Sequence, residues 1–141
     1  MGRYSWPGGP VLIGPSAGGT RFDEQTLTAL ADHLEVDIET VRPDGTRRRT
    51  VIWVMVDAGE VFVRSWKGDR GYWFQSATEP NALVALVVDG RRIPVSVHDA
   101  TDAESVARCS RQLELKYATS PSLKGMLRAD VLGTTLRLEP A

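Results

Sequence analysis

Two pairs of apolar segments joined by very short turns constrain the fold more than any other feature of this sequence. Ala82–Val88 and Arg91–Val97 flank the dipeptide Asp89-Gly90, which is typical of a tight primed hairpin turn. A second pair, 48–56 and 61–66, flanks another short turn. Strands joined this closely pair antiparallel, because parallel pairing needs a crossover of about a dozen residues or more. The sequence therefore predicts an antiparallel sheet and disfavours a doubly wound parallel one.

Helical spacing and alternation of apolar residues predict the other elements. We expect helices over 22–34, 72–77 and 101–117, the last opened by a capping box at Thr101-x-x-Glu104. Further strands are expected over 35–40 and 134–139, and 120–129 is expected to be a loop or a broken helix. About six strands result, and six antiparallel strands can close into a small barrel.

Two strands carry more specific expectations. The continuous apolar run Val51–Val56 predicts that its strand is central and covered on both faces. Pro94 lacks an N–H to donate, so its strand is expected at an edge of the sheet or with a bulge at that residue.

The length of 141 residues suits one domain. A Pro/Gly-rich arm is expected over 1–21 and the folded domain over 22–141. A G-x-S-x-G sequence within the arm lacks the strand and helix that a hydrolase nucleophile requires.

The single cysteine, Cys109, excludes an internal disulfide and fits a reducing cytoplasm. The longest apolar run has seven residues, too few to span a membrane. With His33 and His98 as the only histidines, no metal site is expected.

Charge is unevenly distributed along the chain. The net charge is −1, but Arg42–Arg70 contains seven basic and four acidic residues, a local charge of +3. Such a segment in a nearly neutral protein favours a small-anion site over nucleic acid. Pairing of 48–56 with 61–66 is expected to bring the basic and hydroxyl residues of both strands together, as a phosphate requires. A solvated cluster of charges fits the same pattern equally well.

Aromatic residues gather in the same half of the chain. Trp53, Trp66, Tyr72, Trp73 and Phe74 lie in or near the basic segment. They fit core packing, and they equally fit the walls of a site for a planar ring whose phosphate meets the arginines. Binding of single-stranded nucleic acid is a minor alternative.

Four segments taken in order carry a resemblance to a known family. These are TVIWVM (50–55), VFVRSWK (61–67), GYWF (71–74) and TTLRLEP (134–140). Residues 22–140 resemble a small branch of the FMN-binding split-barrel superfamily, which includes pyridoxamine phosphate oxidases and deazaflavin-dependent nitroreductases. The resemblance implies a mainly β, six-stranded antiparallel split barrel. It also implies a homodimer with FMN or a deazaflavin bound at the subunit interface.

The resemblance also implies which residues form the site. The cofactor phosphate is expected on Arg48, Arg49, Thr50, Ser65 and Lys67. The ring is expected beside Val51, Ile52, Trp53 and Trp73. No residue stands out as a dedicated acid or base, and Tyr72 is the candidate proton donor.

Two functions follow from this resemblance. The first is an oxidoreductase that transfers hydride to or from a small organic substrate. The second is a non-catalytic ligand-binding split barrel that has lost the redox cofactor. The second arises because the asparagine of the deazaflavin enzymes that follows the matched GYWF segment is absent, with Gln75 there instead. Their S-G-K turn is likewise replaced, by Asp44–Arg47.

Overall fold

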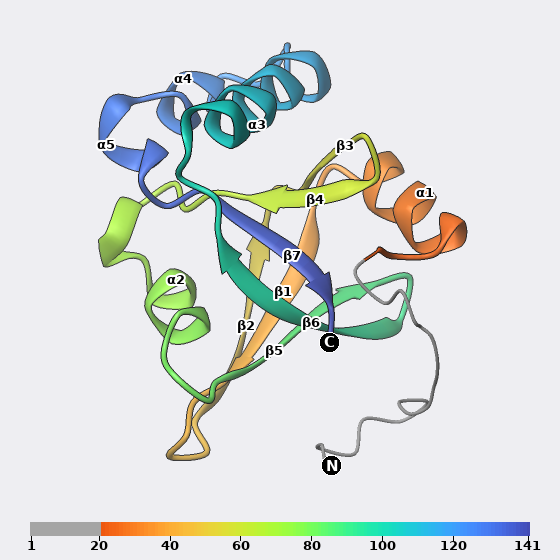
Figure 1. Ribbon diagram of the computed structural model, residues 1–141, viewed down its shortest axis with the longest axis vertical. Coiled ribbons are helices and arrows are strands. Elements are labelled where there is room, and N and C mark those ends of the chain that lie inside the picture. Colours follow the sequence, from red (N-terminus) through yellow and green to blue (C-terminus); the bar gives the residue numbers. More distant parts are fainter. Residues whose placement is uncertain (1–20) are drawn as a thin grey trace.

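The computed structural model describes residues 21–141 (Figure 1). The expected arm, apart from Arg21, and its G-x-S-x-G sequence lie outside these residues, and the domain boundary stays a prediction. The elements are α1 (Glu24–Asp32), β1 (Val36–Val41), β2 (Arg47–Ile52), β3 (Met55–Asp57), β4 (Glu60–Val63), the 3₁₀ helix η2 (Gly68–Arg70), α2 (Tyr72–Ala77), β5 (Leu83–Val88), β6 (Arg91–Asp99), α3 (Ala103–Lys116), α4 (Leu123–Met126), α5 (Ala129–Leu132) and β7 (Leu136–Pro140).

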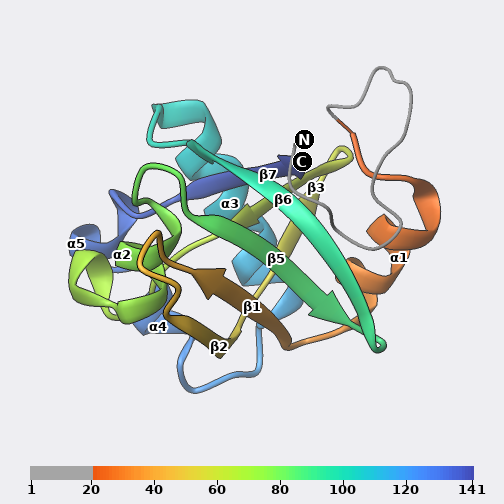
Figure 2. The ribbon, with the colours of Figure 1, turned by 90° about the horizontal axis from the view of Figure 1, so that it is seen from below.

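All strand pairs are antiparallel, in the order β2-β1-β5-β6-β7-β4-β3. The predicted split-barrel class is confirmed, with seven strands instead of six because the expected strand 48–56 is divided into β2 and β3. These two strands are the opposite edges of the sheet, yet only Trp53 and Val54 separate them in the chain. The sheet therefore curls until its edges approach each other (Figures 1 and 2). We call Ile52–Met55 the seam.

The seam breaks the strand because its backbone bonds to α3 instead of to a neighbouring strand. The Val54 N–H donates to the Tyr117 hydroxyl at 3.2 Å, and the Val54 carbonyl accepts from Lys116 Nζ at 2.8 Å. The Trp53 ring stacks on Tyr117 with centroids 3.9 Å apart and planes at 2°. The prediction of a central strand was therefore wrong, since β2 lies at an edge and Val51 is 58% exposed.

The prediction for Pro94 was also wrong, because β6 is an interior strand between β5 and β7. The Pro94 carbonyl accepts from the Ala141 N–H at 3.1 Å. The nitrogen of a strand residue faces the same side as its carbonyl. The missing donor therefore lies at the very end of the β6–β7 pairing, just beyond Val95–Pro140, the last pair between the two strands.

Two apolar clusters fill the molecule. One lies inside the curled sheet and includes Ile38, Leu86 and Leu138. The other lies between the β3–β4 hairpin and helices α3 and α4 (Figure 1), and includes Phe62 and Cys109. Burial raises the pKa of the Cys109 thiol to about 11, which fits its role as a small core side chain.

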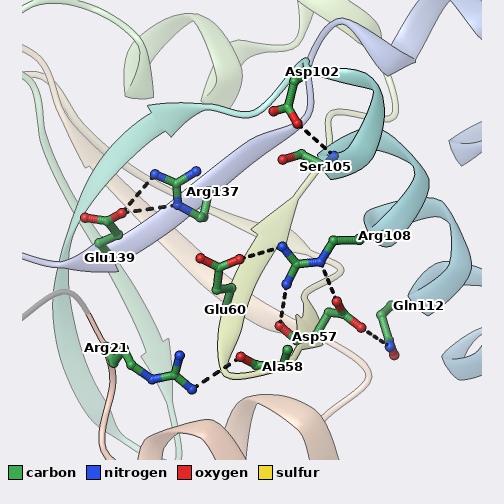
Figure 3. Close-up of polar contacts among 10 residues, drawn as sticks. All are labelled: Arg21, Asp57, Ala58, Glu60, Asp102, Ser105, Arg108, Gln112, Arg137 and Glu139. Carbon is green, nitrogen blue, oxygen red and sulfur yellow. Dashed lines mark hydrogen bonds and ion pairs between the residues drawn. The ribbon is translucent and has the colours of Figure 1, made fainter.

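Helix α3 is capped one residue later than predicted, and it bonds to the β3–β4 hairpin. Asp102, and not Thr101, caps it by accepting from the Ser105 N–H at 3.0 Å. Arg108 then reaches Asp57 and Glu60 at 2.6 and 2.7 Å (Figure 3). Among the described residues, no helix has the length and apolar character needed to cross a membrane.

Candidate functional site

A cavity of about 320 Å³ opens at the seam, bounded by β2, the segment after β4, α2 and α4. It contains four of the residues expected beside a cofactor ring: Val51, Ile52, Trp53 and Trp73. Its full lining is Glu35, Val51, Ile52, Trp53, Arg64, Trp66, Trp73, Ser122 and Met126. A larger groove of about 620 Å³ lies by α2 and the end of β7. None of the predicted site residues lines that groove, so we take the seam cavity as the candidate site.

Three tryptophans from separate parts of the chain form the aromatic wall. Trp53 is held by its stack on Tyr117, and Trp73 is buried in α2. Trp66 is 51% exposed and packs against Gly125, where an added Cβ would lie 2.3 Å from the Trp66 Nε1. The cavity therefore combines a buried aromatic floor with an exposed aromatic rim, as a site for a flat organic molecule requires.

Arg64 is the charged group of the buried wall. It is 1% exposed, and desolvation lowers the pKa of its guanidinium. Its donors reach the Thr135 hydroxyl at 2.9 Å, the Ser110 hydroxyl at 3.0 Å, and the Met126 and Val106 carbonyls at 2.9 and 3.2 Å. All four acceptors are neutral.

The residues predicted to hold a phosphate are not brought together in the structure. Only 55–57 of the expected long strand pair with 60–62, so Arg48 and Ser65 do not face each other across a hairpin as expected. Successive strand residues also point to opposite faces. Arg48 lies 4.2 Å over the Tyr72 ring, whereas Arg49 reaches Glu39 at 3.3 Å on the other face.

Glu39 gathers three arginines on that outer face, namely Arg47, Arg49 and Arg92. Burial raises the pKa of this 3% exposed carboxyl, but the hydrogen bonds from Arg92 and Arg49 outweigh burial and hold it below its ordinary value. Part of the basic segment is therefore a structural ion cluster around a buried carboxylate.

The remaining predicted residues lie around the cavity and not in its lining. The Ser65 hydroxyl is buried and donates to the Gly68 carbonyl at 2.7 Å. Lys67 is exposed, and Thr50 is half-buried on β2. The Tyr72 ring lies beneath the guanidiniums of Arg42 and Arg48. The roles of these residues toward a cofactor stay predictions.

Arg64 and Trp66 are not among the predicted site residues, although both lie in the basic and aromatic segment and Trp66 is one of the aromatic residues that fit a ring site. Alternation along the expected strand 61–66 could have linked the two, because Arg64 and Trp66 are spaced by two residues and would point to the same face of that strand. Met126 had no such signal, since it comes from a four-residue helix in a segment expected to be irregular. In residues 21–141, no group of three or more His, Cys, Asp or Glu residues could hold a metal ion.

Comparisons with solved structures show where this fold recurs. The conserved hypothetical protein Rv2991 from Mycobacterium tuberculosis aligns with a TM-score of 0.56 and 13% identity, over 91% of this chain and 85% of its own. The heme storage protein HutZ from Vibrio cholerae aligns with a TM-score of 0.57 and 13% identity, over 84% and 89%. A heme binding protein from Mycobacterium smegmatis gives 0.57 and 14% identity, over 91% of this chain and 52% of its own.

At these identities the similarity establishes a shared fold. No curated protein matched the sequence. A family model described as "uncharacterized protein conserved in bacteria" (DUF2255) matches residues 26–138. The chain is thus a split-barrel protein, and it belongs to this bacterial family.

Proposed function

We propose that this protein binds FMN or a deazaflavin in the seam cavity and transfers hydride to or from a small organic substrate. The observation that carries the proposal is the convergence of three tryptophans and one buried guanidinium on a single cavity at the seam of a split barrel. Flat aromatic walls suit a tricyclic ring, and a cation suits an anionic cofactor.

The donors present fit such a cofactor in part. The ring would lie against Trp53, Trp66 and Trp73, and the cavity volume is at the lower end of the range for small-molecule sites. For the phosphate, the exposed side chains of Arg48 and Lys67 have free access to solvent. Arg49 and Ser65 are engaged with Glu39 and Gly68 instead.

When bound, the flavin or deazaflavin would supply the hydride chemistry itself. The protein's own contribution would be to position the ring and to exclude water from it. Trp73 and Ile52 do this from the buried side of the cavity, where both are 6% exposed. Tyr72 is our candidate proton donor, at the start of α2 next to Trp73.

The cavity is also proposed to be completed by a second copy of the chain. Val51 and Trp66 are 58% and 51% exposed and both line the cavity. Exposed apolar side chains at the rim of a binding site mark a surface that another molecule covers. A homodimer with the site at its interface would cover them.

The second candidate function is ligand binding without redox chemistry. It is favoured by the engagement of Arg49 and Ser65 in internal contacts. It is also favoured by neighbours of the same fold that are described as heme storage and heme binding proteins. For heme, Met126 is the one lining residue of a type that could hold the iron.

The test is titration of the purified protein with FMN, a deazaflavin and heme, followed by absorption and tryptophan fluorescence. We expect FMN or the deazaflavin to bind and to be weakened about tenfold by Trp66→Ala, since stacking on one aromatic side chain contributes about that much. Leu115→Ala is the control, because Leu115 is 69% exposed on α3 and does not line the cavity. Binding of heme alone would support the second function, and binding of none of the three would overturn both.

A further inference from the structure

Arg64 is a buried cation without a counter-charge in the part of the chain that the structure describes. Its four hydrogen bonds go to two hydroxyls and two carbonyls, and it forms no ion pair with any residue of 21–141. Among the described residues, the ionisable group that bears on the pKa of Arg64 is the thiol of Cys109, and burial raises the pKa of that thiol to about 11. The guanidinium therefore has no carboxylate partner within the described part of the chain.

Such an arrangement is unusual, because a buried charge is normally paired or neutralised. An arginine presents five N–H groups, and within residues 21–141 four of those of Arg64 have partners, which leaves one on Nη2. Arg64 is also one of the residues that line the cavity. A negatively charged group inside the cavity would supply the missing counter-charge and accept the fifth hydrogen bond.

The cavity contains one other charged residue, Glu35. It is exposed, and it forms no ion pair with Arg64 within the described residues. The site is therefore polarised, with a carboxylate on its exposed side and a guanidinium on its buried side. A ligand carrying a negative charge is favoured to place that charge inward.

We propose that Arg64 selects ligands that carry a carboxylate, phosphate or sulfonate group next to a flat aromatic body, and that this anionic group meets Arg64 while the aromatic body lies against the tryptophans. The proposal deepens the proposed function and rests on it only in taking the seam cavity as the ligand site. It names the chemical class of the ligand and the residue that recognises its charge.

The test compares two probes of the same shape, 2-naphthoate and 2-naphthamide, by isothermal titration of the wild-type protein at pH 7. We expect naphthoate to bind about tenfold or more tightly, the ratio that one charge-assisted hydrogen bond supplies. Equal affinity for the two probes would overturn the proposal.

Three variants locate the source of the preference. Arg64→Met is expected to abolish it, and Arg64→Lys to retain most of it, with folding checked by circular dichroism. Arg128→Met is the matched control, because Arg128 is an exposed cation 5.9 Å from the Trp66 ring. It is expected to keep the preference, and loss of the preference in this control would overturn the proposal. If Arg64→Met does not fold, Arg64→Lys and Arg128→Met decide.

The same titrations separate this inference from the proposed function. A naphthoate preference in a protein that binds neither FMN nor a deazaflavin would leave the inference standing without the redox function. Flavin binding in a protein that does not distinguish naphthoate from naphthamide would support the proposed function and overturn the inference about Arg64.

Discussion

At the scale of single residues, the rim of the cavity is shaped by a glycine. Gly125 in α4 allows the Trp66 ring to lie against the helix, because any side chain at this position would occupy the space of the indole. We expect Gly125→Ala to displace Trp66, shift the tryptophan emission and weaken flavin or naphthoate binding several-fold. Gly133→Ala is the control, since a Cβ there has no neighbour within 4 Å. An unchanged emission spectrum in Gly125→Ala would contradict this packing.

Lys116 is the residue through which the seam responds to pH. Its ammonium donates to the carbonyls of Leu30 and Val54, but desolvation lowers its pKa from 10.5 to about 8. Between these values the unfolded chain binds one proton more than the folded one, so stability rises with pH. Cys109 has the opposite effect on stability above pH 9. Burial raises the pKa of its thiol to about 11, so the folded chain keeps a proton that the unfolded chain loses, and stability falls as the pH rises.

The contribution of Lys116 is therefore best measured between pH 8 and 9, as the difference between wild type and Lys116→Met. From pH 8 to pH 9 we expect the free energy of unfolding of the wild type to rise relative to that of the variant. The expected rise is less than about 1 kcal/mol, since the ammonium is only partly buried. Urea unfolding at both pH values measures the gain. A constant difference would mean that Lys116 titrates normally.

At the scale of elements, α3 holds the β3–β4 hairpin through charge as well as through apolar packing. Arg108 bonds the Asp57 carboxylate, the Asp57 carbonyl and Glu60, and Gln112 adds a bond to Asp57 (Figure 3). The hydrogen bonds from Arg108 are the main reason that the pKa of Asp57 lies below its ordinary value. The Arg108 and Asp57 side chains are 20% and 15% exposed, so this pair is screened by solvent less than a surface pair.

Removing the arginine leaves a partly buried carboxylate without its partner. We expect Arg108→Met to lower the free energy of unfolding by about 2 kcal/mol. Arg128→Met breaks an ion pair with Asp130 whose side chains are 45% and 74% exposed, and it is expected to cost less than about 1 kcal/mol. Equal losses in the two variants, measured by urea unfolding, would show that burial does not strengthen the Arg108 pair.

Sequence patterns predicted correctly those elements whose structure depends on residues adjacent in the sequence. The Asp89-Gly90 turn has both residues at positive φ, as a primed hairpin turn requires, and α2 has the predicted bounds. The division of 48–56 into β2 and β3 could not be predicted, because the bonds that open the strand at Val54 come from Tyr117 and Lys116, some 60 residues later.

The same contrast applies to the candidate site. Val51, Ile52, Trp53 and Trp73 line one cavity, and their place beside a cofactor ring stays a prediction. The proposed meeting of Arg48, Arg49 and Ser65 depended on one uninterrupted hairpin. The break at the seam removed that register, and the alternation along β2 turned Arg49 toward Glu39. Arg64 gains its significance only from its burial, which the sequence does not show.

At the scale of the whole molecule, the seam is the feature that connects fold and site. The chain passes from one edge of the sheet to the other through Trp53 and Val54, so no ladder closes the barrel there, and the cavity opens at this gap. Edge strands with exposed apolar side chains are normally covered in native proteins. An isolated subunit would leave Val51 and Trp66 in water next to the site.

The dimer proposed above makes a prediction about Val51. Its cross-strand partner is Asp37, so Val51→Lys introduces a charge that a subunit can pair internally and that costs the monomer little. Buried between two subunits, the same lysine would be desolvated, and we expect the variant to be monomeric and to lose at least about tenfold in ligand affinity. Leu34→Lys is the control, because Leu34 is 59% exposed and does not line the cavity. Sedimentation velocity at micromolar concentration gives the oligomeric state. A monomeric wild type would refute the dimer, as would a dimeric Val51→Lys variant that binds ligand with full affinity, and the cavity of one subunit would then be the whole site.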